Sequence, residues 1–156
     1  DDMDDTMRRK DRQLTALVAN EILETGAICQ LALVAQGEPY LVTMNYGYRD
    51  STLYFHCARA GRKLEVIEQN NRVCFTVVEH GAVLPAEKAC DFTMKYRSVV
   101  GYGTARVIDG YQEKCEALGI IMAQYASGNF EFPDATLAAT AVFAVDISSM
   151  AAKSNL

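Results

Sequence analysis

The sequence predicts a six-stranded, mainly antiparallel β-barrel with two or three flanking helices. Apolar segments of strand length follow one another directly through residues 27–57, and helical patterns interrupt the strand segments at only a few places. Strands that follow one another in sequence favour antiparallel pairing and a barrel over a parallel sheet wound with helices. At 156 residues the chain is most simply one domain with a substantial core.

The N-terminal part is predicted to hold a tail, a helix and then three strands. Residues 1–10 begin with the acidic run DDMDD and are expected to form a flexible tail, with residues 11–150 as the single domain. A helix is expected next and ends at Gly26; its apolar residues at helical spacing are Leu14, Leu17, Val18 and Ile22. Gly-Glu-Pro and Arg-Asp-Ser then divide residues 27–57 into three strands.

The second of these strands alternates along residues 40–46. One side carries Tyr40, Val42, Met44 and Tyr46, and the other carries Leu41, Thr43 and Asn45. Both sides are partly apolar, which predicts a barrel whose outer surface is also covered.

The C-terminal part is predicted to alternate between strands and two further helices. We expect a short helix over residues 61–70 with Leu64 and Ile67 inward, then a strand in RVCFTVV, a loop over residues 79–89, and a long strand over residues 90–108. That long strand is either continuous or two strands hinged at Gly101 and Gly103. A helix follows with one apolar face, then a loop over residues 128–135 and a last strand over residues 140–149. The residues expected on that helical face are Cys115, Leu118, Met122 and Tyr125.

Composition excludes several classes of protein. The net charge of −5 argues against a nucleic-acid binder, which needs a basic face. No apolar run approaches the length needed to cross a bilayer. Five cysteines without a Cys-x-x-Cys pair argue against a disulfide framework or a metal site, and reduced thiols in a cytoplasmic protein fit better.

Two cations, Arg62 and Lys63, fall in what should be the first turn of a helix. The positive end of the helix dipole and the free N–H groups already lie there, so each exposed cation costs about 0.3–1 kcal/mol. A bound phosphate would reverse this cost, because the N–H groups and both side chains would converge on it. Gly61 would let a phosphate approach the backbone closely. The alternative is a solvated Arg-Lys pair on a surface helix.

His56 and Cys57 end the strand that leads into this turn. His56 is expected to line a cofactor; the alternatives are a packed strand-end histidine and a catalytic base. A Cys-His nucleophilic pair is disfavoured because adjacent strand residues point to opposite faces. A zinc site is disfavoured because the other histidine, His80, lies in a remote segment.

In order along the chain, the segments MRRKDR, LALV, GEPYLVTMNYGY, LYFHCARAGRK, NNRVCF and KYRSVVGYG resemble the flavin-binding split β-barrel proteins of the pyridoxamine 5′-phosphate oxidase-like superfamily. The resemblance extends from about Met7 to Ser148 and is greatest to the nitroimidazole-resistance, nitroreductase-like branch. It implies a homodimer with FMN, or alternatively FAD or a deazaflavin, at the subunit interface.

The resemblance also implies roles for individual residues. Arg62 and Lys63 match the phosphate-binding pair, and His56 matches a position close to the reactive face of the flavin, which makes it the candidate catalytic residue. The other positions that match the cofactor site are Val42, Thr43, Met44, Asn45, Cys57, Ala58, Arg97 and Ser98.

Two departures from the family bear on function. Ala58 stands where relatives often carry a phosphate-binding serine or asparagine. The segment SSMAAKSNL lacks the tryptophan and arginine that the true oxidase uses on its substrate, which argues against pyridoxamine phosphate oxidation. The resemblance therefore implies an FMN-dependent oxidoreductase that reduces a small organic acceptor, such as a nitroaromatic. The alternatives are a flavin-storage or flavin-sensing protein, and a pyridoxamine phosphate oxidase-like enzyme.

Overall fold

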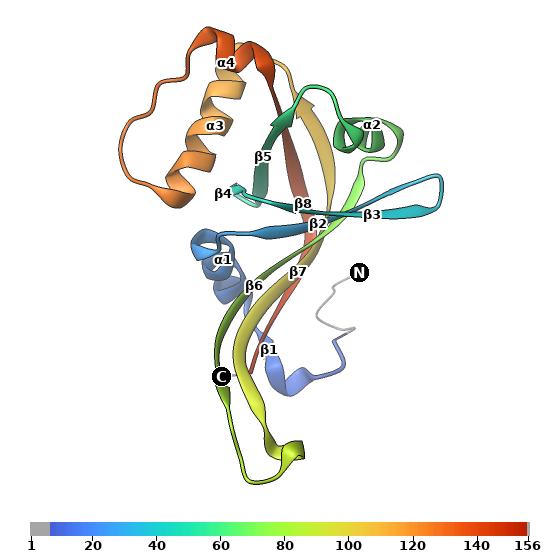
Figure 1. Ribbon diagram of the computed structural model, residues 1–156, viewed down its shortest axis with the longest axis vertical. Helices are drawn as coiled ribbons and strands as arrows, with labels where there is room; N and C mark the ends of the chain where they lie inside the picture. Colours follow the sequence, from blue (N-terminus) through green and yellow to red (C-terminus); the bar gives the residue numbers. More distant parts are fainter. Residues whose placement is uncertain (1–6, 156) are drawn as a thin grey trace.

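The computed structural model describes residues 7–155, and its centre is one antiparallel β-sheet (Figure 1). Hydrogen-bonded neighbours follow the order β3-β2-β6-β7-β8-β5-β4, and β1 pairs with β8 outside this path. The strands are β1 (Gln13–Leu14), β2 (Cys29–Ala35), β3 (Glu38–Met44), β4 (Gly47–Arg49), β5 (Thr52–Ala58), β6 (Arg72–Leu84), β7 (Thr93–Ile108) and β8 (Thr140–Ser154). The fold class predicted from the sequence is confirmed, with eight strands in place of six.

The sheet has two free ends, which makes the barrel a split one. β3 pairs only with β2, and β4 pairs only with β5, so the described strands contain no ladder between β3 and β4. The chain nevertheless passes directly from Met44 to Gly47, and this short connection holds the two free ends near each other. The backbone edge of β3 that faces away from β2 therefore lacks a strand partner.

Helices pack on the sheet in three places. The four α-helices are α1 (Ala16–Thr25), α2 (Arg62–Gln69), α3 (Tyr111–Tyr125) and α4 (Asp134–Ala139), and two 3₁₀ turns are η2 (Lys10–Arg12) and η3 (Ala89–Asp91). α3 and α4 lie together at one end of the molecule, and α2 lies beside the β2–β3 hairpin (Figure 1). α1 packs against β6, β7 and β8.

β8 contributes side chains to both hydrophobic clusters of the core. Its alternate residues face opposite ways: Phe143 and Val145 pack in the main cluster of the barrel, whereas Val142 and Ala144 pack against α3 and α4. The rings of Phe55 and Phe143 stack with centroids 5.0 Å apart. A strand buried on both faces reads as a continuous apolar run, and AVFAV has this pattern.

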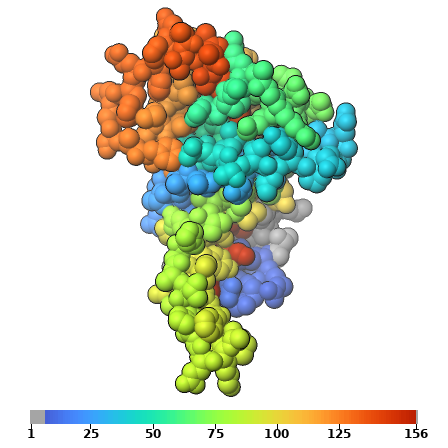
Figure 2. Space-filling view, in the orientation of Figure 1, coloured from blue at the N-terminus to red at the C-terminus, as the bar shows by residue number. Residues whose placement is uncertain are grey.

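β6 and β7 continue past the barrel as a projecting hairpin, here called the arm (residues 78–96; Figure 2). The predicted loop over residues 79–89 is therefore wrong at its start, because β6 runs to Leu84 and pairs Val83 with Met94. His80 consequently lies in a strand, beside an irregularity in the ladder between His80 and Val83. Cross-strand hydrogen bonds stabilise this segment without a core, which the sequence pattern does not reveal.

β7 is a single strand rather than two hinged ones. It runs from Thr93 to Ile108, and the change at the glycines is confined to a register shift against β8 between Tyr102 and Gly103. A Cβ atom at Gly101 would collide with the ring of Phe75, so this glycine admits a close approach of β7 to the core.

The first helix begins later than predicted. Thr15 is its N-cap and accepts a hydrogen bond from the backbone N–H of Val18, so Leu14 belongs to β1. Leu17 is 79% exposed, and the buried face consists of Ala19, Ile22 and Leu23. Residues 1–6 of the predicted tail lie outside the described part of the chain, whereas Lys10 opens η2.

The buried face of α3 is also displaced from the predicted one. It comprises Lys114, Ala117, Leu118 and Ile121, of which only Leu118 was predicted. Lys114 is buried because its ammonium donates to the carbonyl of Leu137 at 2.5 Å. Leu137 belongs to α4, a helix that begins within the predicted loop over residues 128–135.

All five cysteines are unpaired, and their exposure ranges from Cys29 in the core to Cys90 at the surface. Within residues 7–155 no group of three or more His, Cys, Asp or Glu side chains is placed to hold a metal ion. None of the helices described is long and apolar enough to span a membrane.

Candidate functional site

A pocket of about 470 Å³ opens where the ends of β3 and β5 meet the start of α2. Its lining comes from four segments of the chain: Thr43, Met44 and Asn45; His56, Cys57 and Ala58; Lys63; and Ala139 and Thr140. Seven of these nine residues are among the sequence-predicted site residues, and the structure brings them together around one space.

The pocket exists because β3 and β5 do not pair with each other. β5 is bonded to β4 and β8, while β3 is at the free end of the sheet, so their last residues face each other across the split. β5 ends at Ala58, and a three-residue turn leads into α2 at Arg62. The last of these residues, Gly61, has a φ of 153°, which a residue with a side chain rarely adopts.

Lys63 is the cation of this pocket. It occupies the second position of α2, where the backbone N–H groups of the first turn lack helical partners. Burial raises the pKa of the Cys57 thiol, and the nearby ammonium of Lys63 partly offsets this rise. The thiol is therefore neutral near pH 7, and Lys63 has no carboxylate partner among the described ion pairs.

Arg62 does not line the Lys63 pocket. Its guanidinium carbon lies 4.7 Å from the centroid of the Tyr40 ring, within cation–π range. It lines a separate pocket of about 370 Å³ between α2 and the β2–β3 turn. The two adjacent cations therefore face two different spaces.

His56 and Cys57 face opposite sides of β5, as the sequence predicted. The His56 side chain is exposed at the pocket, whereas Cys57 is half-buried and packs against the main core cluster. Among residues 7–155, neither side chain belongs to a group of three or more His, Cys, Asp or Glu residues that could hold a metal ion.

The end of β3 is polar and fixed by side-chain hydrogen bonds. The Thr43 hydroxyl donates to Gln30 Oε1 at 2.6 Å, and the Asn45 amide Nδ2 donates to the carbonyl of Ala27 at 3.3 Å. Val42, also predicted to be a site residue, is half-buried against the core and does not line the pocket.

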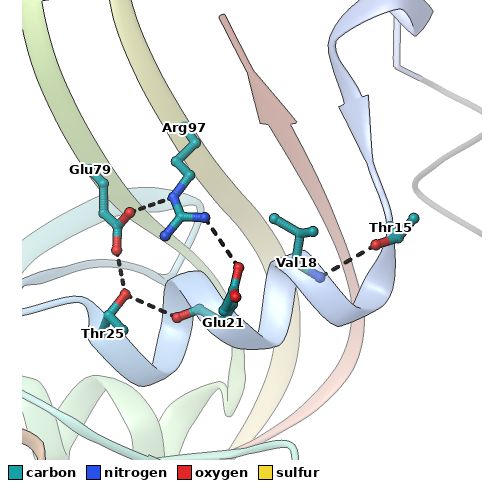
Figure 3. Close-up of polar contacts among 6 residues, drawn as sticks. All are labelled: Thr15, Val18, Glu21, Thr25, Glu79 and Arg97. Carbon is teal, nitrogen blue, oxygen red and sulfur yellow. Dashed lines mark hydrogen bonds and ion pairs between the residues drawn. The ribbon is translucent and has the colours of Figure 1, made fainter. Parts of the chain in front are cut away.

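Arg97 and Ser98 do not line this pocket either. Arg97 is bound by carboxylates: its Nε lies 2.6 Å from Glu79 Oε2 and its Nη1 lies 3.3 Å from Glu21 Oε2 (Figure 3). The Thr25 hydroxyl lies 2.5 Å from the second oxygen of Glu79 and completes the cluster. Ser98 is 5% exposed and pairs in register with Val78 and Lys153.

Sequence reasoning missed Ala139 and Thr140. They enter the pocket wall because β5 pairs with β8 in a register that sets Ala58 opposite Thr140. Neither residue type carries a chemical signal, and only the strand pairing reveals their position.

Another pocket of similar size, about 480 Å³, lies between α1, β4 and α3. It contains the carboxylates of Glu24 and Glu116, and its one cation, Arg49, lies 3.9 Å from Asp50. A phosphate would be repelled there, so the Lys63 pocket is the better candidate for an anionic cofactor.

Comparison with known proteins agrees with this architecture. A candidate 5-nitroimidazole antibiotic resistance protein from Bacteroides thetaiotaomicron VPI-5482 is 28% identical, with a TM-score of 0.82 over 91% of this chain and 86% of that one. The flavocytochrome Anf3 from Azotobacter vinelandii is 21% identical, with a TM-score of 0.85 over 96% and 72%. An FAD-binding protein from Mesorhizobium loti is 23% identical, with a TM-score of 0.72 over 93% and 98%. No curated protein matches the sequence.

The split sheet with its pocket at the free end of β3 defines the class of split β-barrel proteins. The family model for pyridoxamine 5′-phosphate oxidase matches residues 17–154, and the chain belongs to that family.

Proposed function

We propose that this chain binds a flavin nucleotide in the Lys63 pocket and acts as a flavin-dependent oxidoreductase on a small organic acceptor, such as a nitroaromatic. FMN is the first candidate and FAD the alternative. One observation carries the proposal: Lys63, the first turn of α2 and the unpaired edge of β3 all lie at the same pocket.

The residues present fit a flavin. A volume of about 470 Å³ lies in the range of small-molecule and cofactor sites, about 300–1,000 Å³. Lys63 and the N–H groups of the first turn supply a cation and donors for the phosphate. The free edge of β3 supplies backbone donors and acceptors at Thr43 to Asn45, which suit the polar edge of a flavin ring.

Each part of the pocket then has its own task. Lys63 binds the phosphate and so fixes the ligand at one end. Met44 is 8% exposed and gives the pocket a rigid apolar contact, while Thr43 and Asn45 hold the strand end in place through Gln30 and Ala27. The bound flavin would supply the electrons for reduction.

His56 is the residue placed to handle protons. Its imidazole is exposed on the side of β5 that opens to solvent, where a small acceptor can reach it. Imidazole can donate or accept a proton near neutral pH, so His56 would protonate an acceptor as it is reduced.

We further propose a homodimer with the flavin at the interface. The arm exposes apolar side chains that a lone protomer leaves in water, among them Val83 at 52% and Phe92 at 50%. Arg97 lies away from the Lys63 pocket of its own chain, so the contact predicted for it would be made to the partner's flavin, whereas Ser98 is buried within its own sheet.

The first experiment is the visible absorbance spectrum of the purified protein, followed by release and identification of the chromophore. About one flavin per chain supports the proposal. A colourless protein that also refuses added FMN and FAD overturns it.

Turnover is tested next with a reduced nicotinamide donor and a panel of nitroaromatic and quinone acceptors. Reduction of an acceptor supports an oxidoreductase. A protein that retains flavin but turns over no acceptor supports the alternative of flavin storage or sensing.

A further inference from the structure

The chain crosses the split in the sheet at Asn45 and Tyr46, which lie between β3 and β4 and are here called the joint. Asn45 lines the Lys63 pocket, and Tyr46 is fully buried. Because β3 and β4 do not pair across the split, the joint lies outside the strand ladders of the described sheet. Its backbone groups therefore need partners that the sheet does not supply.

The last residue of α3 supplies such a partner. The Tyr125 hydroxyl accepts a hydrogen bond from the backbone N–H of Tyr46 at 2.9 Å and donates to the carbonyl of Ala27 at 2.6 Å. The Asn45 amide Nδ2 donates to the same carbonyl at 3.3 Å. One tyrosine oxygen thus connects the joint to the segment between α1 and β2.

Gln124, next to Tyr125, bonds to the elements on both sides of the joint. Its Oε1 accepts a hydrogen bond from the backbone N–H of Tyr48 in β4 at 3.2 Å. Its Nε2 lies within 3.0 Å of three carbonyl oxygens at the end of α1, where carbonyls lack helical partners. These carbonyls belong to Leu23, Glu24 and Gly26. The last turn of α3 is therefore bonded both to α1 and to β4.

β4 also begins in direct contact with the backbone of α3. A Cβ atom at Gly47 would lie 2.7 Å from backbone atoms of Ile120 and Ile121, closer than a side chain allows. Only a glycine lets the strand lie this close to the helix. Since the joint lies between this contact and the end of β3, α3 determines where the joint lies.

Tyr125 acts on the Lys63 pocket only through the joint. It does not line that pocket, and it is 43% exposed. The side chain of Tyr46 is fixed separately, by its burial and by a hydrogen bond of 2.6 Å from its hydroxyl to the carbonyl of Leu23. Removing the Tyr125 hydroxyl would therefore loosen the backbone of the joint without exposing the core.

We propose that Tyr125 is a positioning residue of the Lys63 pocket. Its hydroxyl fixes the joint, and with it Asn45 and the free end of β3, in place of the strand pairing that the split removes. The effect on a ligand rests on the proposed function, whereas the fixing of the joint is a property of the ligand-free protein and can be measured there.

The test is the variant Tyr125→Phe, which removes one oxygen atom and leaves the ring in place. Hydrogen exchange of the full chain, after removal of any bound flavin, reports on the Tyr46 amide. We expect this amide to exchange about tenfold faster in Tyr125→Phe, because it loses its acceptor. The matched control is Tyr48→Phe, which removes a hydroxyl bonded to Asn20 of α1 and should leave the Tyr46 amide unchanged.

Fluorescence titration then measures FMN affinity for the same three proteins. Tyr125→Phe should bind FMN about three- to tenfold more weakly, and Tyr48→Phe should stay within about twofold of the unmodified protein. Both variants lose a tyrosine hydroxyl and one side-chain hydrogen bond or more. A loss of affinity confined to Tyr125→Phe therefore comes from the joint and not from a general loss of stability.

Two results would overturn the inference. One is unchanged exchange of the Tyr46 amide in Tyr125→Phe. The other is faster exchange with unchanged FMN affinity, which would make the hydroxyl a contact of the fold alone. If the unmodified protein binds no flavin, the proposed function is wrong, and the exchange measurement alone decides whether Tyr125 fixes the joint.

Discussion

Arg97 and Glu79 face each other across β6 and β7, in register, with 2.6 Å between Nε and Oε2 (Figure 3). Both side chains are less than a third exposed, and Glu21 adds a second carboxylate from α1. The pair therefore joins the base of the arm to the first helix.

Arg97→Ala and Glu79→Gln should each destabilise the protein, and a double-mutant cycle should give a coupling of about 1 kcal/mol in urea denaturation. If Arg97 also contacts the partner's flavin, as we propose, Arg97→Ala weakens flavin binding whereas Glu79→Gln spares it. Equal flavin affinity in both variants would restrict Arg97 to a structural role.

Substitutions at Lys63 and Arg62 should lower flavin affinity more than they change the free energy of unfolding. Lys63→Ala should weaken flavin binding about 10- to 100-fold, since a hydrogen bond to a charged group contributes about 1.5–3 kcal/mol. The flavin-free protein should keep its free energy of unfolding within about 0.5 kcal/mol, because removing a cation from the start of a helix relieves the dipole. Fluorescence titration and urea denaturation measure the two quantities. The matched control is Arg49→Ala, an exposed cation at the end of β4 that lies outside the Lys63 pocket and the arm. Full flavin retention by the double variant Arg62→Ala, Lys63→Ala would end the phosphate assignment.

His56 should affect turnover more than flavin binding. His56→Ala should lower kcat for an acceptor by about 10²-fold, because a positioned proton donor contributes about 10²–10⁴-fold. Flavin content should stay near that of the unmodified protein. Glu68→Ala changes an exposed residue of α2 outside the pocket and should leave both quantities unchanged. If His56→Ala leaves the kinetics unaltered across the acceptor panel, His56 lines the pocket but takes no part in proton transfer.

The cysteines should differ sharply in reactivity. Burial raises the pKa of the Cys29 thiol to about 12, so this thiol stays protonated in the folded protein. At pH 8 a maleimide should label Cys90 rapidly and Cys29 only after unfolding. Unfolding should also become easier as the pH rises from about 9 to about 12, because only the unfolded chain loses the Cys29 proton there. The slope is at most about 1.4 kcal/mol per pH unit. Labelling of Cys29 in the folded protein at pH 8 would contradict this assignment.

The arm should carry the dimer contact. The double variant Val83→Lys, Phe92→Lys places charges at two apolar residues that are about half exposed. We expect sedimentation to show a dimer for the unmodified protein and a monomer for this variant, with flavin binding weakened at the same time. Val107→Lys changes an exposed apolar residue at the far end of β7 and is the control. A monomeric unmodified protein that binds flavin fully would refute the interface site.

The parts of the fold and site that follow from local pattern were predicted from the sequence. His56 to Lys63 is one continuous segment of strand, turn and helix, so its residues had to lie together. The predicted alternation of side chains along β3 is also confirmed, because Met44 is buried on one side while Leu41, on the other, is 64% exposed.

Features that depend on distant pairing were missed. The extension of β6 and the pocket residues Ala139 and Thr140 require the strand register, which a single sequence does not contain. The face of α3 was misplaced because an apolar pattern does not include lysine, whereas the carbonyl of Leu137 gives Lys114 a buried partner.

The pairing of β5 with β8 has a consequence for how the protein folds. Ala58 and Thr140 are roughly 80 residues apart along the chain, and their contact closes the wall of the Lys63 pocket. Closing so long a loop costs entropy before any contact compensates for it, so this pairing should form late. Early folding intermediates would then have no complete pocket to offer a ligand. Since a ligand that binds only the finished protein stabilises it by mass action, cofactor supply in the cell would set how much of the newly made chain stays folded.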